Sequence, residues 1–202
     1  MRRLVTLAAT AAALGLLAAG CGGGTKTPVG NVPSKYAGAE FTGKPAAPNF
    51  ALRDQNGKRI SLASQRGRLV FVTFLYTHCP DVCPLIATHL SDALERLPAA
   101  QRATTILAVS TDPRRDTPAA AREFVRQHAL VPQFHFLVGS KRELARVWRA
   151  YHVAVVPGKD LVGHTAFMLL IDRQGRQRLL YDSKSRTSAL DHDLRLLLNP
   201  SD

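Results

Sequence analysis

One apolar run near the middle of the chain constrains its fold more than any other feature. Residues 68–77 read RLVFVTFLYT, and nearly all of them are aliphatic, aromatic or β-branched. Such a run, without regular polar alternation, is typical of a strand that is covered on both faces of a sheet. Because helices usually provide that cover on both sides, the run predicts an α/β domain.

The segments around this strand alternate between strand and helix patterns. The chain offers further buried strands at 104–110 and 134–138 and helices at 81–97, 117–129, 140–148 and 187–198. Two hairpins are also indicated, one over residues 50–62 with Asn56-Gly57 at its turn and one over residues 165–181. This order predicts a central mixed sheet of parallel and antiparallel strands, flanked by helices, with an N-terminal β-hairpin.

The first residues have the pattern of an export signal. Met1-Arg2-Arg3 is positively charged, and residues 4–20 carry no charge and end in small residues just before Cys21. This predicts a signal peptide over residues 1–20. The site resembles a bacterial lipobox, so we favour cleavage before Cys21 and lipidation of its thiol over ordinary cleavage or an uncleaved helix. We therefore expect an extracytoplasmic protein, anchored to the cell membrane by an N-terminal lipid.

Residues 21–48 have the composition of a tether. From Gly22 to Pro48 the chain contains six glycines and four prolines but few large apolar residues. Such a segment buries too little apolar surface to fold alone. We expect a flexible tether over 21–48, followed by a single domain over residues 49–202.

The chemistry-bearing residues lie where the central strand runs into the next helix, in YTHCPDVCP at 76–84. This point is at the carboxyl edge of the sheet, where α/β folds usually bind ligands. Cys79 lies near the start of the helix, which favours a thiolate, and Cys83 follows one turn later on the same face. The converging thiols can cycle with a disulfide or hold a soft metal. A static structural disulfide and two inert core cysteines are the alternatives.

A metal site needs a further ligand, and His164 is the strongest candidate among seven histidines. It follows Gly158 and Gly163 in a loop and begins the apolar strand at 165–171. A surface histidine is the simpler interpretation of this position. If it is a ligand, two thiolates and one imidazole favour Cu(I), with Zn(II) as an alternative.

Three segments together resemble the Sco/SenC family, in the form of a bacterial lipoprotein. They are YTHCPDVCP at 76–84, STDPRRDTP at 110–118 and GHTAFMLLID at 163–172. The resemblance extends from about Pro48 to Leu198. It implies a thioredoxin-like fold and a membrane-tethered copper protein that assists assembly of the CuA site of cytochrome c oxidase.

The resemblance also implies roles for single residues. The family's copper ligands fall on Cys79, Cys83 and His164, and Asp81 and Asp112 fall on positions that surround those ligands. The implied cargo is copper as Cu(I), with Cu(II) as a second oxidation state. Thioredoxin-like reductases usually place a proline opposite the dithiol, and this chain has His164-Thr165-Ala166 there, which favours a metal site.

Two functions follow from this combination. The first is a copper chaperone that delivers copper to, or prepares the thiols of, the CuA site. The second is a thiol-disulfide oxidoreductase for exported proteins, with Cys79 and Cys83 as its redox pair. The expected partners are a copper-receiving oxidase subunit and either another copper chaperone or a thiol reductant.

The net charge of +12 bears on partners as well. So basic a chain suits nucleic acid when it is cytoplasmic. For an exported protein we expect anionic lipid head groups and acidic protein surfaces instead, and no nucleic-acid partner.

Overall fold

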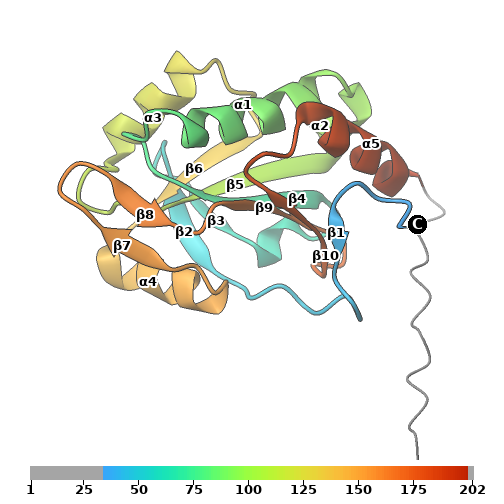
Figure 1. The fold of residues 1–202 in the computed structure, drawn as a ribbon, viewed down its shortest axis with the longest axis horizontal. Helices are drawn as coiled ribbons and strands as arrows, with labels where there is room; N and C mark the ends of the chain where they lie inside the picture. Colours follow the sequence, from blue (N-terminus) through green and yellow to red (C-terminus); the bar gives the residue numbers. More distant parts are fainter. Residues whose placement is uncertain (1–33, 200–202) are drawn as a thin grey trace, which may run out of the picture. The chain divides into compact units, whose positions relative to one another are not determined.

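The computed structural model describes residues 34–199, and these contain an eight-stranded sheet, a separate two-stranded hairpin and helices on both faces of the larger sheet (Figure 1). The strands are β1 (Ala39–Glu40), β2 (Ala51–Asp54), β3 (Arg59–Ser61), β4 (Leu69–Leu75), β5 (Thr104–Ser110), β6 (Phe134–Val138), β7 (Val155–Pro157), β8 (Val162–His164), β9 (Phe167–Ile171) and β10 (Gln177–Asp182). The helices are η1 (Ala63–Gln65), α1 (Val82–Glu95), α2 (Pro98–Ala103), α3 (Pro118–Gln127), α4 (Lys141–Ala150) and α5 (Thr187–Leu198). The predicted signal peptide over 1–20 and Cys21 lie outside the described residues.

The larger sheet has the strand order β1-β10-β9-β4-β5-β6-β2-β3. β4 runs parallel to β5, and β5 runs parallel to β6, whereas β9, β10 and β2 join their neighbours in antiparallel pairs. Every residue of β4 and β5 is buried. The predicted α/β fold with a central mixed sheet and an N-terminal hairpin is therefore confirmed.

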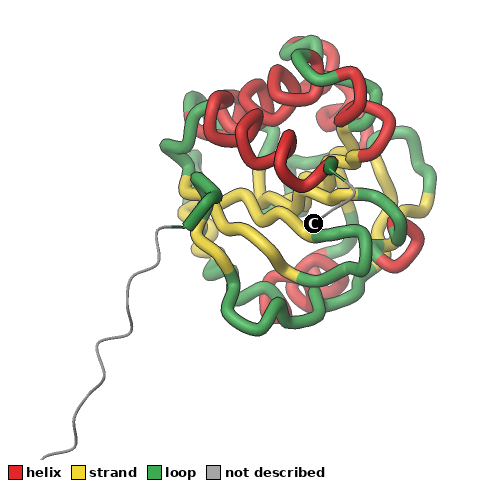
Figure 2. The backbone as a smooth tube through the Cα atoms, turned by 90° about the vertical axis from the view of Figure 1, so that its right-hand side faces the viewer, coloured by secondary structure: helices red, strands yellow, loops and turns green. Residues whose placement is uncertain are grey.

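Two apolar layers cover the sheet, and β4 contributes to both of them. Phe71 and Leu75 pack with α1, α2, α3 and α5 on one face, while Val72 and Phe74 pack with α4 on the other. Figure 2, turned by 90°, shows the strands between these two helical layers. Within residues 34–199, no helix has the length and apolar composition that a membrane span requires.

Helix α2 and the hairpin β7-β8 were not expected from the sequence. Helix α2 is a single short segment with Pro98 in its first turn, and so short a stretch carries no apolar period. The hairpin β7-β8 lies around Gly158, where the sequence indicated only a loop, and its register pairs Val155 with His164. His164 therefore ends β8 instead of beginning β9.

The last part of the predicted tether packs onto the domain. Strand β1 pairs with β10, and the side chain of Tyr36 is buried. Asp193, which is fully buried on α5, accepts hydrogen bonds from the backbone N–H groups of Ala37 (2.8 Å) and Gly38 (2.9 Å). A Cβ at Gly38 would lie 2.7 Å from the Tyr181 ring, so glycine permits this close approach. The ordered domain thus includes Ser34–Pro48, unlike the predicted boundary at Asn49.

Candidate metal centre

The loop that carries Cys79 is fixed at both of its ends. At the end of β4, the Thr77 backbone N–H (2.9 Å) and hydroxyl (2.7 Å) both donate to the buried carboxylate of Asp116. Asp116 also accepts a hydrogen bond from the Ser110 hydroxyl at the end of β5 (2.5 Å). At the other end, the Asp81 side chain caps α1 by accepting from the Val82 N–H. Two parallel strands and one helix start therefore position the cysteine loop.

The structure brings Cys79 and Cys83 together as two free thiols. The backbone N–H of Cys83 donates to Cys79 Sγ at 3.3 Å, and the two side chains also hydrogen bond to each other. Cys79 is 8% exposed and Cys83 is 0% exposed. Both cysteines are therefore buried, and Cys79 is the more accessible of the two.

The hydrogen bonds divide the two cysteines into a thiolate and a thiol. The Cys83 thiol is the main hydrogen-bond donor to Cys79. Further donors are the backbone N–H groups of Cys83 and Asp81 and the Tyr76 hydroxyl. Together these donors lower the pKa of Cys79 to about 5, although burial acts in the opposite direction. The same hydrogen bond, together with burial, raises the pKa of Cys83 above its ordinary value. At neutral pH we expect an anionic Cys79 that is stabilised by a protonated Cys83.

This assignment predicts the pH dependence of alkylation. Because only the thiolate reacts, the rate of Cys79 modification by iodoacetamide should rise through about pH 5 and level off by neutral pH. Cys83→Ala removes the main donor and should move this rise to higher pH. Peptide mass spectrometry of quenched samples of the reduced chain measures both profiles. A rise only near pH 9, the ordinary thiol value, would show that Cys79 is not a stabilised thiolate.

Tyr76 links the cysteine loop to the hairpin that carries His164. Its hydroxyl donates to Cys79 and accepts from the Val162 backbone N–H at the start of β8. Its ring meets the His164 imidazole edge-on, with 5.9 Å between the ring centroids. Burial and the nearby Cys79 charge raise the pKa of Tyr76 to about 12, so it stays a neutral donor at physiological pH. Tyr76 was not among the predicted site residues, although its position just past the end of a buried strand was an available signal.

The hydrogen bonding of His164 suits a metal ligand. Its Nδ1 lies 3.1 Å from the Thr165 backbone carbonyl, which can only accept. Nδ1 therefore carries the proton, and the Nε2 lone pair is left available. A backbone carbonyl on one ring nitrogen is the usual arrangement for a histidine that binds a metal through the other.

The three predicted ligands are not all assembled. Among residues 34–199, no three His, Cys, Asp or Glu side chains are close enough together to hold a metal ion. The structure joins Cys79 to Cys83 and places His164 against Tyr76, which itself contacts Cys79. The donor types fit a soft metal, and the three-residue ligand set stays a prediction.

Comparisons with known proteins identify the family of the chain. A family profile described as SCO1/SenC matches residues 39–199. The chain belongs to the SCO1/SenC family. The SCO2-like protein RT0576 of Rickettsia typhi is 31% identical over 134 residues, which are 63% of this chain and 65% of that protein. The chain thus aligns to slightly less than two thirds of the length of this curated relative.

Solved structures of Sco proteins share the fold. The Bradyrhizobium japonicum ScoI structure with copper bound is 33% identical, with a TM-score of 0.67, and the match covers 75% of this chain and 99% of that one. The apo Sco1 protein from Thermus thermophilus is 31% identical, with a TM-score of 0.71 and coverage of 80% and 96%. These likenesses confirm the expected thioredoxin-like architecture and the Sco/SenC resemblance.

In this SCO1/SenC domain, the two predicted outer carboxylates have different surroundings. The side chain of Asp81 caps α1. The buried Asp112 forms an ion pair with Arg115, whose guanidinium also donates to the Asp160 carbonyl between β7 and β8 (2.8 Å). Asp112 therefore holds Arg115 in the position from which its guanidinium contacts the β7-β8 hairpin that carries His164. Arg115 was not among the predicted site residues.

Proposed function

We propose that the chain is a copper chaperone that binds Cu(I) through Cys79, Cys83 and His164 and passes it to another protein. The observation that carries this proposal is the reduced, hydrogen-bonded cysteine pair, with a histidine nearby whose Nε2 is available. Two soft sulfurs and one imidazole are ligands that suit Cu(I). The copper-bound state of the 33% identical ScoI of Bradyrhizobium japonicum supports the same cargo.

The three proposed ligands have different roles when copper binds and leaves. Cys79 is already a thiolate and offers the first sulfur, while Cys83 loses its proton when copper binds. His164 joins from β8 once its edge contact with Tyr76 opens. Release is an exchange of these ligands, one at a time, for those of the acceptor.

We propose that the acceptor is the subunit of cytochrome c oxidase that holds the CuA site, as the family resemblance implies. The proposed export signal over residues 1–20 and lipid on Cys21 would anchor the chain on the membrane that holds the oxidase. Of the proposed tether over residues 21–48, the part that the structure describes, Ser34–Pro48, packs onto the domain. Another copper chaperone or a thiol reductant would supply copper or electrons.

Thiol-disulfide exchange is a second candidate, which the low pKa of Cys79 favours. Cys79 Sγ would attack a partner disulfide and form a mixed disulfide, releasing the first partner thiolate. Cys83 would then lose its proton and attack Cys79 Sγ, which releases the second partner thiolate. Two electrons pass to the partner, and a thiol reductant must restore the Cys79–Cys83 pair.

Copper titration tests the main proposal. The reduced full-length chain, in detergent, should bind one equivalent of Cu(I) in competition with a chromophoric Cu(I) chelator. The double variant Cys79→Ser, Cys83→Ser, which keeps the size of both side chains, should bind none. A wild-type chain that cannot compete with the chelator, or a double variant that competes equally well, would overturn the chaperone proposal.

A further inference from the structure

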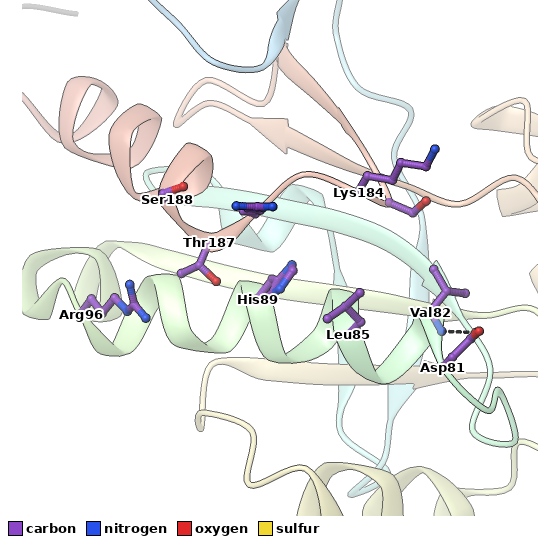
Figure 3. A pocket seen from close by; sticks show the side chains of 10 residues that line it. Asp81, Val82, Leu85, His89, Arg96, Lys184, Thr187 and Ser188 are labelled. Carbon is purple, nitrogen blue, oxygen red and sulfur yellow. Dashed lines mark hydrogen bonds between the residues drawn. The ribbon is translucent and has the colours of Figure 1, made fainter.

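A groove starts beside the cysteine loop, at Asp81, and extends along the outer face of α1 as far as Arg96 (Figure 3). Its volume is about 760 Å³. One wall is the exposed face of α1, and the other wall is the segment that joins β10 to α5. The lining residues are Asp81, Val82, Leu85, His89, Arg96, Ser183, Lys184, Arg186, Thr187 and Ser188.

The two walls are held in place by hydrogen bonds. The Asp182 carboxylate accepts from the Lys184 backbone N–H (3.0 Å) and from the Ser185 hydroxyl (2.8 Å), which fixes the turn after β10. His89 on α1 has its Nδ1 3.1 Å from the Ser185 backbone carbonyl and therefore ties that turn to the helix. The groove is therefore formed before anything enters it.

The floor of the groove is apolar near the cysteine loop. Leu85 is 47% exposed, although the other large aliphatic residues of α1, Ile86, Leu90 and Leu94, are fully buried. Val82 precedes Leu85 by one helical turn, so the two side chains form a continuous apolar strip. An exposed strip of this kind suits an aliphatic side chain of another molecule.

The rim of the groove is positively charged. Arg96, Lys184 and Arg186 are exposed along it, and Asp81 is the single acid in the lining. Within residues 34–199, neither Arg96 nor Arg186 forms a salt bridge with a carboxylate. Arg96 and Arg186 are therefore available to carboxylates of another molecule, whereas the charge of Lys184 also acts on the neighbouring Asp182 carboxylate. Complementary charge steers and orients a protein partner.

We propose that this groove docks an acidic segment of the partner protein, with an aliphatic residue over Val82 and Leu85 and carboxylates toward Arg96, Lys184 and Arg186. The inference rests on the proposed function, because it concerns the partner that meets Cys79 and Cys83. The groove begins at Asp81, between the two cysteines. A segment bound there therefore places the rest of its protein beside the thiols.

A peptide titration tests this docking site. The probe is a fluorescein-labelled peptide in which Leu alternates with pairs of Glu, added to the reduced, copper-free full-length chain in detergent and followed by fluorescence anisotropy. Charge reversal with Lys184→Glu and Arg186→Glu should weaken binding roughly tenfold or more. Leu85→Ser should also weaken it, and added salt should weaken wild-type binding.

Matched controls come from other surfaces. Arg142→Glu with Arg146→Glu reverses two charges on α4, and Leu161→Ser removes an aliphatic side chain that is 56% exposed between β7 and β8. Both controls should bind the peptide as wild type does. Amide chemical shifts of the labelled chain should change at Val82, Leu85 and Thr187.

Several outcomes would overturn the proposal. They are no binding of the peptide by the wild-type chain, equal weakening by the control variants, or shift changes confined to another surface. Vesicles of phosphatidylglycerol provide a further arm: if the groove variants lose vesicle binding but keep peptide binding, the rim serves lipid. The peptide carries neither copper nor thiols, so a failed copper titration with intact peptide binding would count against the copper proposal alone.

Discussion

His164→Ala is expected to lower the Cu(I) affinity of the reduced chain by about 100-fold or more, because it removes one of three proposed ligands. Two thiols would remain at Cys79 and Cys83, so residual weak binding is consistent with the assignment. The variant should fold normally, since His164 is only half-buried at the end of a short hairpin. Competition against a chromophoric Cu(I) chelator measures the affinity, and circular dichroism checks the fold.

The neighbouring histidine provides the control for this experiment. His78 lies beside Cys79 in sequence and has its Nδ1 2.9 Å from the Thr77 hydroxyl. His78→Ala should leave the copper affinity within a fewfold of wild type. If His78→Ala causes the loss and His164→Ala does not, the third ligand has been assigned to the wrong residue. His164→Ala should also keep the rate at which Cys79 and Cys83 reduce a test disulfide, which separates the two candidate functions.

If His164 is the third ligand, its present position requires a local rearrangement when copper binds. Its ring contacts Tyr76, and Tyr76 in turn hydrogen bonds to both Cys79 and the backbone of β8. The opposite side of the hairpin is held by Arg115 through the Asp160 carbonyl. We infer that the hairpin shifts about these two contacts when the third ligand joins the thiols.

The elements that could be predicted from the sequence are those whose signals are local. The buried character of β4 depends on residues within one strand, and this prediction matches the structure. The predicted convergence of Cys79 and Cys83 also matches, although Cys79 lies in the loop before α1 and only Cys83 lies on the helix. The Ser34–Pro48 segment was predicted as tether because its composition is poor in apolar residues. Its order depends on Asp193, more than 150 residues away in the chain, and no local pattern reports such a contact.

The same distinction applies to the candidate site. The cysteines that meet are only four residues apart in the sequence, whereas Asp116, Tyr76 and Arg115 act across elements. Asp116 reaches Thr77 from the loop after β5 only because β4 and β5 are parallel neighbours in the sheet. Strand order decides which loops meet, and a single sequence leaves that order open.

Oxidation of Cys79 and Cys83 to a disulfide is expected to abolish stoichiometric Cu(I) binding, because a disulfide removes both proposed thiolate ligands at once. The backbone N–H of Cys83 already lies 3.3 Å from Cys79 Sγ, so the two cysteines are neighbours in the existing loop. Treatment of the full-length chain with oxidised glutathione, removal of the reagent and titration with Cu(I) measure the effect. Mass spectrometry verifies that Cys79 and Cys83 are the residues joined.

Reversibility distinguishes loss of ligands from damage to the protein. Reduction of the oxidised chain should restore one equivalent of binding, since each sulfur then regains its role as thiolate or thiol. The double variant Cys79→Ser, Cys83→Ser should bind no Cu(I) either before or after glutathione treatment. Tight Cu(I) binding by the fully oxidised chain would mean that the copper site lies away from these cysteines. Loss of binding that reduction does not reverse would indicate unfolding. In that case a thiol reductant could not regenerate a copper-binding chain from the oxidised form.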